Sequence, residues 1–244
     1  WRLGLIPEAW DTWRSRHLKE NTELSRQEQL VEGRLRIARG DTWIGLDQLW
    51  RLSLRWRTPT CLEGVELHQS QFPRPFATTF QQAAESEKVP RDLLFAIAKQ
   101  ESRFASGVTS IAGAQGLMQL MPATAEELAD RPLSIDELRS TELNTRLAAR
   151  YLHDLLELWD HDPVLAIASY NAGPGNATHW LSEEARQDPE LWVERIPFPE
   201  TRYYVKKVLA NWVGYREPLR SDHCQRQGTG QMVADPNAQQ QPTG

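Results

Sequence analysis

Apolar positions near the N-terminus recur at helical spacing in two stretches separated by Gly40-Asp41. Glycine ends helices and aspartate caps them, so the pattern predicts two short antiparallel helices joined at this dipeptide. The first is marked by Leu24, Val31, Leu35 and Ala38, and the second by Trp43, Leu46, Leu49, Trp50 and Ser53. Such pairs bury their apolar faces only against neighbours, so we expect residues 1–71 to form the end of a larger helical stack. Six of the ten Trp lie in this stretch, and we interpret them as interhelical packing rather than ligand binding.

The segment Phe72-Pro-Arg-Pro-Phe76 predicts a domain boundary, because proline fixes extended geometry and disfavours helix at the preceding residue. A second helical domain is expected over residues 72–220, with its first helix starting near Thr78. Its further helices are predicted from Arg91 behind Pro90 to about Phe104, from Thr141 as cap to Trp159, from Asp162-Pro163 to Gly173, and from about Pro199 to Tyr215. The last one carries Tyr204, Val208, Asn211 and Tyr215 on one face. No window alternates convincingly as a long strand, so the predicted fold class is all-α.

The composition of the chain limits the classes of protein to which it can belong. The 244 residues include 28 Lys and Arg against 33 Asp and Glu, a net charge of -5 that argues against a nucleic-acid binder. The apolar stretch Leu93 to Ala98 is far shorter than the ~20 residues that cross a bilayer.

Cys61 and Cys224 are too few for a disulfide scaffold, and whether they pair stays open. Residues 221–244 are rich in Gln, Gly, Pro and Asn, which predicts a disordered tail. The start at Trp1 without a leader suggests a mature or excised segment.

One carboxylate breaks the helical pattern. In the helix after Pro90, Glu101 follows Leu94, Ile97 and Ala98 at spacing that should face the core. Burial disfavours the charged form and raises the pKa of a carboxyl group, which makes Glu101 a candidate general acid. The alternative from periodicity alone is a structural glutamate satisfied by an arginine or by backbone donors.

Two further segments combine glycine with polar residues. The stretch from Gly113 to Ala125 holds two glycines, Gln119 and Met121 before a proline that can start a helix. Tyr170 and Asn171 stand at the end of a predicted helix before Gly173. Each segment also has a purely structural interpretation. In the first, Met118 and Met121 would fill the core, and in the second, Asn171 and Gly173 would end a helix. Neither segment has the spacing of a phosphate-binding loop.

Taken together, these motifs resemble the soluble lytic transglycosylases of bacterial cell walls. The resemblance covers about residues 72–217, and the preceding helices look like the tail of that family's superhelical region. It rests on Gln100-Glu101-Ser102, Gly113-Ala114, Gly116 to Ala125, Tyr170 to Gly175, and Ile196 to Val205, which occur in the family's order and spacing. Two positions depart from the family pattern, Ser169 where alanine is commoner and the bulky Tyr203, and they blur fine specificity.

The resemblance implies a lysozyme-like helical catalytic domain that cleaves the β-1,4 bond between N-acetylmuramic acid and N-acetylglucosamine in peptidoglycan. Glu101 would be the catalytic acid and base. The substrate-binding residues carried over with it are Ser110, Gln119, Met121, Tyr170, Asn171, Glu200 and Tyr204. The expected partner is the glycan strand, and no nucleic acid, metal or cofactor is expected. The chain is expected to be a monomer outside the cytoplasm, in the periplasm or cell envelope, with membrane attachment left open.

The mechanism is inferred from the lack of a second carboxylate in the segments that hold the site motifs. Hydrolysis of a glycoside ordinarily uses two, yet residues 103–125 and 164–182 contain no Asp or Glu. We hypothesise that Glu101 protonates the leaving oxygen and then deprotonates the muramic acid 6-hydroxyl, which attacks C1 and closes a 1,6-anhydro ring. Two alternatives remain: a hydrolytic muramidase in which Glu200 activates water, and a non-catalytic peptidoglycan-binding module.

Overall fold

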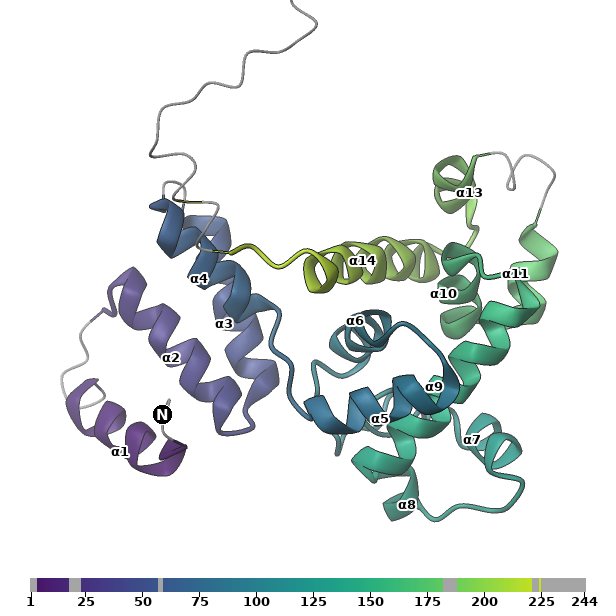
Figure 1. Cartoon of the computed structure of the whole chain (residues 1–244), viewed down its shortest axis with the longest axis horizontal. Coiled ribbons are helices and arrows are strands. Elements are labelled where there is room, and N and C mark those ends of the chain that lie inside the picture. The colour runs from purple at the N-terminus through teal and green to yellow at the C-terminus, as the bar shows by residue number, and fades with distance from the viewer. Residues whose placement is uncertain (1–3, 18–22, 57–58, 182–187, 221–223, 225–244) are drawn as a thin grey trace, which may run out of the picture.

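The computed structural model describes residues 4–17, 23–56, 59–181, 188–220 and 224, and these are folded as a helical protein (Figure 1). The helices are α1 Ile6–His17, α2 Arg26–Ala38, α3 Thr42–Arg55, α4 Cys61–Gln71, α5 Ala77–Glu87, α6 Arg91–Glu101, α7 Pro122–Ala129, α8 Ile135–Arg139, α9 Thr141–Leu158, α10 Pro163–Ala172, α11 Pro174–Trp180, α13 Pro189–Arg195 and α14 Pro199–Arg216. Within the described ranges the only β-type pairing is a set of isolated bridges that join Gln115 to Thr109 and to Leu120. The all-α prediction is confirmed.

The predicted N-terminal helix pair is present as α2 and α3, but its contact face differs from the prediction. Trp43 and Trp50 are 55% and 59% exposed, whereas Leu49 is fully buried. A β-carbon on Gly45 would lie 2.6 Å from the carbonyl oxygen of Gly33, so the two backbones meet at small residues. Bulky indoles cannot fit at such a close approach, and the expectation that these two tryptophans pack between the helices is therefore wrong.

Helix ends were predicted less accurately than helix positions. Helix α6 ends at Glu101 rather than near Phe104, because Arg103 and Phe104 take positive φ values of 50° and 65°. Ser140, not Thr141, caps α9 by accepting a bond from the Leu143 amide. Asp162 caps α10 as predicted, through bonds from the next two free amides.

The prediction that Asp41 caps α3 is only partly correct. Asp41 does stand at the N-cap of α3, but its side chain accepts no capping bond. The carboxylate instead pairs with Arg39 at 3.1 Å. Position alone therefore located the start of α3.

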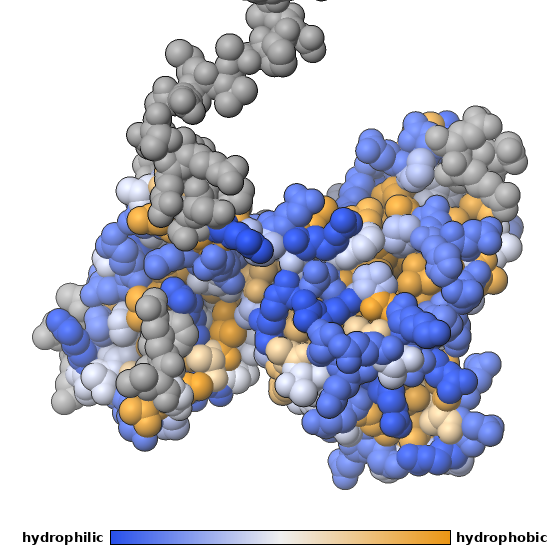
Figure 2. Space-filling model, viewed as in Figure 1, coloured by the Kyte–Doolittle hydropathy of each residue, from blue (hydrophilic) through white to orange (hydrophobic). Residues whose placement is uncertain are grey.

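Two buried clusters hold the described helices together. The smaller cluster lies among α2, α3 and α4 and consists of Leu30, Leu49, Leu52, Trp56 and Leu67. The larger one is built mainly from α5 to α14, although Leu46 of α3 also joins it. Polar side chains cover most of the face seen in Figure 2. The two clusters fit a division near residue 72, and the boundary itself stays a prediction.

Helices α6 and α14 lie antiparallel at the centre of the larger cluster. Phe95 stacks on Tyr215 at 5.4 Å near the start of α6, and Glu101 meets Tyr204 at its other end. Tyr215 also donates to the carbonyl of Pro73 at 2.9 Å, which holds the linker segment against α14. This pairing places the C-terminal end of α6 beside the first turns of α14.

The chain returns to α4 after α14. Cys61 at the start of α4 forms a disulfide with Cys224, and Gln69 donates to the carbonyl of Leu219 at 3.0 Å. The remainder of the predicted tail over 221–244 lies outside the described residues. Of the described helices, none combines the length and the apolar character that a membrane span requires.

Candidate active site

Glu101 lies at the C-terminal end of α6, a helix whose residues Leu93 to Ala98 are buried in the core. Leu94, Ile97 and Ala98 on the same stripe are fully buried, which confirms the anomalous position of the carboxylate. Glu101 is the last residue of the helix, and the next residue, Ser102, is buried and donates to the Leu117 carbonyl at 2.6 Å. This bond ties the end of α6 to the glycine-containing loop, so the carboxylate is held at a fixed point between them.

The surroundings of Glu101 favour its protonated form. Burial raises the pKa of Glu101 from 4.5 to about 7, a bond from the Tyr204 hydroxyl opposes the rise, and the charge of Glu200 adds to it. The Tyr204 hydroxyl donates to Glu101 Oε1 at 2.6 Å. Among the described residues no Arg or Lys forms an ion pair with this carboxylate, so the alternative of an arginine-satisfied structural glutamate lacks its partner. A carboxyl group that titrates near neutrality can both give and take a proton.

A second buried tyrosine lies close to the acid. The Tyr170 hydroxyl donates to the Met118 carbonyl at 2.9 Å. Burial raises the pKa of Tyr170 well above its usual value, and the nearby charge of Glu101 contributes to the rise. Tyr170 therefore stays a neutral hydrogen-bonding group and joins α10 to the loop.

Asn171, the neighbour of Tyr170, links α10 to α14. Its Oδ1 atom accepts a bond from the Thr201 hydroxyl at 2.7 Å. Thr201 is itself buried one turn before Tyr204 on α14. The Tyr-Asn pair and the final motif thus meet through side chains, although they are about 30 residues apart in the sequence.

The loop beside the acid is pinned by one buried asparagine. Asn144 on α9 accepts from the Met118 amide at 2.7 Å and donates to the carbonyls of Gln115 and Leu138 at 3.1 and 2.8 Å. Gly116 has a φ of +80°, and a β-carbon there would lie 2.7 Å from the Leu138 carbonyl. Only glycine tolerates both conditions, so this position depends on its absent side chain.

Within the described structure the other predicted site residues form no hydrogen bond with Glu101. Ser110 accepts from the Ala114 amide at 3.0 Å and closes a turn. The Gln119 amide donates to the carbonyls of Val108 and Gly116, so it serves its own loop. Met121 is 44% exposed at the N-cap of α7. Glu200 is exposed in the first turn of α14.

Sequence reasoning missed the residues that hold the site together. Asn144 carried no signal, because a buried polar residue is recognised only by the partners around it. Thr201 stood within the quoted segment from Ile196 to Val205, but its bond to Asn171 depends on a helix about 30 residues away. Ser102 was noticed within its motif, but its bond to Leu117 depends on a loop 15 residues away. The departing Ser169 has a structural role, since it is fully buried and accepts from the Trp159 indole at 2.8 Å. Tyr203 is exposed and leaves the centre unchanged.

Within the part of the chain that the structure describes, no three His, Cys, Asp or Glu side chains are grouped to bind a metal ion. The site presents one protonatable carboxyl, Glu101, beside the phenols of Tyr170 and Tyr204, whose pKa values are raised well above the usual value. Such a constellation can deliver a proton to a leaving oxygen and then recover one.

Comparison with known proteins agrees with this geometry. The family model of the transglycosylase SLT domain matches residues 78–193, and that of the soluble lytic transglycosylase helical domain matches residues 195–222. The second match spans α14 with a few residues on either side of it, so the resemblance of residues 1–71 to a superhelical region stays a prediction.

Several characterised proteins are similar to this chain. The soluble lytic murein transglycosylases of Salmonella typhimurium and Escherichia coli are 36% identical over 167 residues and 37% identical over 155 residues, which cover 63% and 61% of this chain. The chain spans only 26% and 24% of the length of these relatives.

Solved structures are similar over a larger share of the chain. The 70 kDa soluble lytic transglycosylase of Escherichia coli covers 88% of this chain, and this chain 34% of it, at 29% identity and a TM-score of 0.68. An inactive Glu-to-Gln mutant of the lytic transglycosylase Slt from Pseudomonas aeruginosa covers 79% of this chain, and this chain 30% of it, at 33% identity and a TM-score of 0.67. The site motifs, the helical fold and these matches agree, and this chain belongs to the soluble lytic transglycosylase family.

Proposed function

We propose that the protein is a peptidoglycan lytic transglycosylase that cleaves the β-1,4 bond between N-acetylmuramic acid and N-acetylglucosamine and leaves 1,6-anhydro-muramic acid ends. The observation that carries this proposal is the half-buried Glu101 carboxyl, whose pKa is raised to about 7 by desolvation and which accepts a bond from the Tyr204 hydroxyl. The family relation supplies the substrate class, because the relatives are named murein transglycosylases.

The first step requires a proton at the glycosidic oxygen. Protonated Glu101 donates that proton as the C1–O bond breaks and the N-acetylglucosamine hydroxyl leaves. Tyr204 stays neutral and donates to Oε1, since burial together with the charge of Glu101 raises the pKa of Tyr204 well above its usual value. This bond stabilises the carboxylate that the first step produces.

The second step uses a nucleophile from the substrate. The Glu101 carboxylate removes the proton from the muramic acid 6-hydroxyl, whose oxygen attacks C1 and closes the 1,6-anhydro ring. Glu101 returns to its protonated form, so atoms and charge balance over the cycle. Because the attack is intramolecular, no second carboxylate is needed to activate water.

We propose that the groups around Glu101 bind the reacting sugars. Tyr170 and Asn171 from α10, Met121 before α7, and Ser110 and Gln119 from the loops are the contacts carried over from the family. Their polar atoms are held by the protein itself, as in the bond from Thr201 to Asn171. Held groups cost little entropy when the glycan strand binds.

The hydrolytic alternative is kept because Glu200 lies near enough for its charge to raise the pKa of Glu101. A water activated by Glu200 would give reducing muramic acid ends instead of anhydro ends. Digestion of purified glycan strands in water labelled with heavy oxygen separates the two reactions. We expect unlabelled fragments that are one water lighter than hydrolysed fragments in mass spectrometry, and a majority of labelled reducing ends would reject the proposal.

The cell envelope is the proposed location. Peptidoglycan lies outside the cytoplasm, and the disulfide between Cys61 and Cys224 suits an oxidising compartment. The glycan strand is the proposed partner, bound by a monomer. Fractionation of cells that carry the tagged protein tests the location, and release of the protein with cytoplasmic markers would contradict it.

A further inference from the structure

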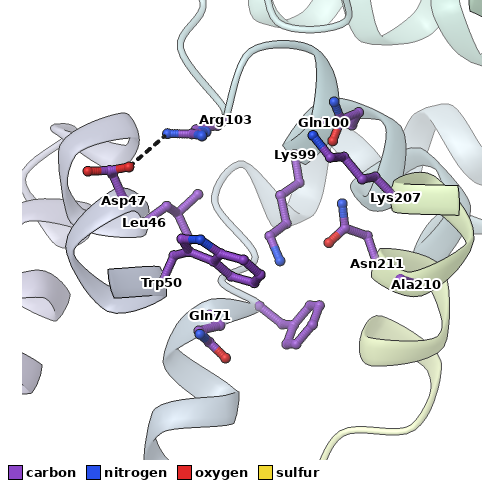
Figure 3. Close-up of a pocket in the computed structure, with 11 residues that line it drawn as sticks. Leu46, Asp47, Trp50, Gln71, Lys99, Gln100, Arg103, Lys207, Ala210 and Asn211 are labelled. Carbon is purple, nitrogen blue, oxygen red and sulfur yellow. Dashed lines mark ion pairs between the residues drawn. The ribbon is translucent and has the colours of Figure 1, made fainter. Parts of the chain in front are cut away.

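A cavity borders α6, and Glu101 is not among the residues that line it. It has a volume of about 410 Å³, within the range of small-ligand sites. It lies between α3, α4, α6 and α14, and the side chains of Lys99 and Asn211 extend toward one another inside it (Figure 3). It is lined by Leu46, Asp47, Trp50, Gln71, Phe72, Lys99, Gln100, Arg103, Lys207, Ala210 and Asn211.

Positive charge predominates in this cavity. Lys99, Arg103 and Lys207 face a single acidic residue, Asp47. The Asp47 carboxylate is already bound to Arg51 at 2.7 Å and lies 3.8 Å from Arg103. Among the described residues no carboxylate lies within ion-pair distance of Lys99 or Lys207. The cavity therefore has two cationic groups without an anion of the protein to balance them.

Lys99 is held in place before any ligand arrives. Its Nζ atom lies 3.8 Å from the ring centroid of Phe72 and 5.9 Å from that of Tyr215. Burial lowers the pKa of Lys99 to about 7, and repulsion from Arg103 adds to the effect. The remaining titratable group that faces it is His68 on α4, whose pKa is lowered by burial and by Lys99 itself. An anion brought to this ammonium would relieve the cost of its desolvation.

The uncharged residues that line the cavity indicate which groups a ligand would carry besides its anionic group. Gln100 and Asn211 present carboxamides that can both donate and accept, as a peptide backbone requires. Trp50 is 59% exposed and, with Phe72, offers an apolar wall for short side chains. We propose that this cavity binds the terminal carboxylate of a short peptide, between Lys99 and Lys207, and that the peptide is one carried by the glycan substrate.

The offset along α14 between Tyr204, which is bound to Glu101, and the cavity residue Asn211 suits such a peptide. Tyr204 and Asn211 are seven residues apart on one face of α14, which corresponds to roughly 10 Å along the helix axis. An extended peptide of three or four residues spans about that length. The source of the peptide rests on the proposed function, whereas the carboxylate site rests on the cavity alone.

Binding of free peptides tests the site independently of cleavage. The probes are acetylated tri-alanine with a free terminal carboxylate and the same peptide with a terminal carboxamide, titrated into the full chain by NMR. We expect the carboxylate peptide to bind and the carboxamide to bind at least tenfold more weakly. Lys99→Met and Lys207→Met should each weaken carboxylate binding at least tenfold. Lys206→Met is the matched control, because Lys206 is next to Lys207 on α14 but pairs with Glu194 and does not line the cavity.

Equal binding of the two peptides, or an equal loss in Lys206→Met and Lys207→Met, would overturn the site. Melting curves of each variant keep a folding defect from being read as lost binding, and Lys207→Met, at an exposed position, is the variant expected to fold normally.

Kinetics identify the source of the peptide. We expect kcat/KM for peptide-bearing strands, divided by that for strands freed of peptide by amidase, to fall at least fivefold in Lys207→Met and to stay constant in Lys206→Met. Carboxylate binding with a constant ratio in both variants would support the site and overturn the glycan as its source. If the wild-type chain cleaves neither kind of strand, the proposed function fails while the peptide titration still decides the site.

Discussion

At the scale of single residues, the chemistry depends on the burial of one carboxyl group. Glu101→Gln keeps the shape of the side chain and an oxygen that can accept from Tyr204, but it removes the transferable proton. We expect glycan binding to persist and turnover to fall at least a thousandfold, in line with the loss of a general acid and base. The exposed Glu157→Gln on α9 is the control. Near-normal turnover of Glu101→Gln would remove Glu101 from the mechanism.

The same substitution should stabilise the protein above neutral pH. Because folding raises the pKa of Glu101 from 4.5 to about 7, the folded state binds more protons than the unfolded state between these values. Its free energy of unfolding therefore falls as the pH rises through this window, and it levels off above about 7. A neutral Gln avoids this loss, so Glu101→Gln should gain up to about 3 kcal/mol over the wild type at pH 8. Denaturant unfolding at pH 4 and pH 8 measures the difference, which should nearly vanish at pH 4.

Tyr204 tunes the acid rather than reacting. Its bond lowers the pKa of Glu101 against the effect of burial, so Tyr204→Phe should raise that pKa by about 1 unit, the value of one charge-assisted hydrogen bond. Activity requires the protonated acid and should decline above about pH 7 in the wild type. In Tyr204→Phe the decline should start at higher pH, with a modest fall in kcat. The exposed neighbour in Tyr203→Phe should leave the pH profile unchanged; if Tyr204→Phe does so too, the assignment of Tyr204 is wrong.

At the scale of elements, α9 holds the loop that borders the site. Asn144→Ala leaves the buried Met118 amide and two carbonyls without their partner, which should cost about 3 kcal/mol of unfolding free energy. Since the Met118 carbonyl also accepts from Tyr170, we expect turnover to fall with stability. Asn176→Ala on α11 is the control, because that side chain is exposed and donates to a single carbonyl. Equal melting temperatures for the two variants would contradict the role of Asn144.

At the scale of the whole molecule, the disulfide joins the end of the chain to α4. It closes a loop of 163 residues, which can stabilise the folded state by at most about 5 kcal/mol through the entropy of the unfolded chain. The sequence pattern alone predicts that deleting residues 221–244 leaves folding and turnover nearly unchanged. The disulfide changes the expectation for folding, because the deletion also removes Cys224.

Two truncations test the corrected expectation. Removal of residues 225–244 keeps the disulfide and should leave the melting temperature unchanged. Removal of residues 221–244 should lower it, to the value reached by the full chain with reductant or by Cys224→Ser. The disulfide has no residue in common with the contact between Glu101 and Tyr204. Both truncated chains should therefore keep their turnover below their melting temperatures. Equal melting temperatures of the two truncations would show that the disulfide contributes nothing.

The sequence by itself determined the helical class, most helix positions and the catalytic candidate. These are local properties: spacing of apolar residues, caps such as Asp162 and Gly173, and a carboxylate on an apolar stripe. Helix ends were less accurate, because positive φ at Arg103 and Phe104 depends on the loop into which α6 leads. The motifs that resemble the family supplied the remaining site residues, which periodicity could not.

Only the tertiary structure decided which of these residues meet. Tyr204 reaches Glu101 across 103 residues of sequence, Asn144 pins a loop 26 residues away, and Cys61 pairs with Cys224. The exposure of Trp43 and Trp50 and the cationic cavity beside them arise where α3 faces α6 and α14. Hydrogen bonds and desolvation act between groups that are close in space, and the spacing of residues along one helix carries no information about the partner on another.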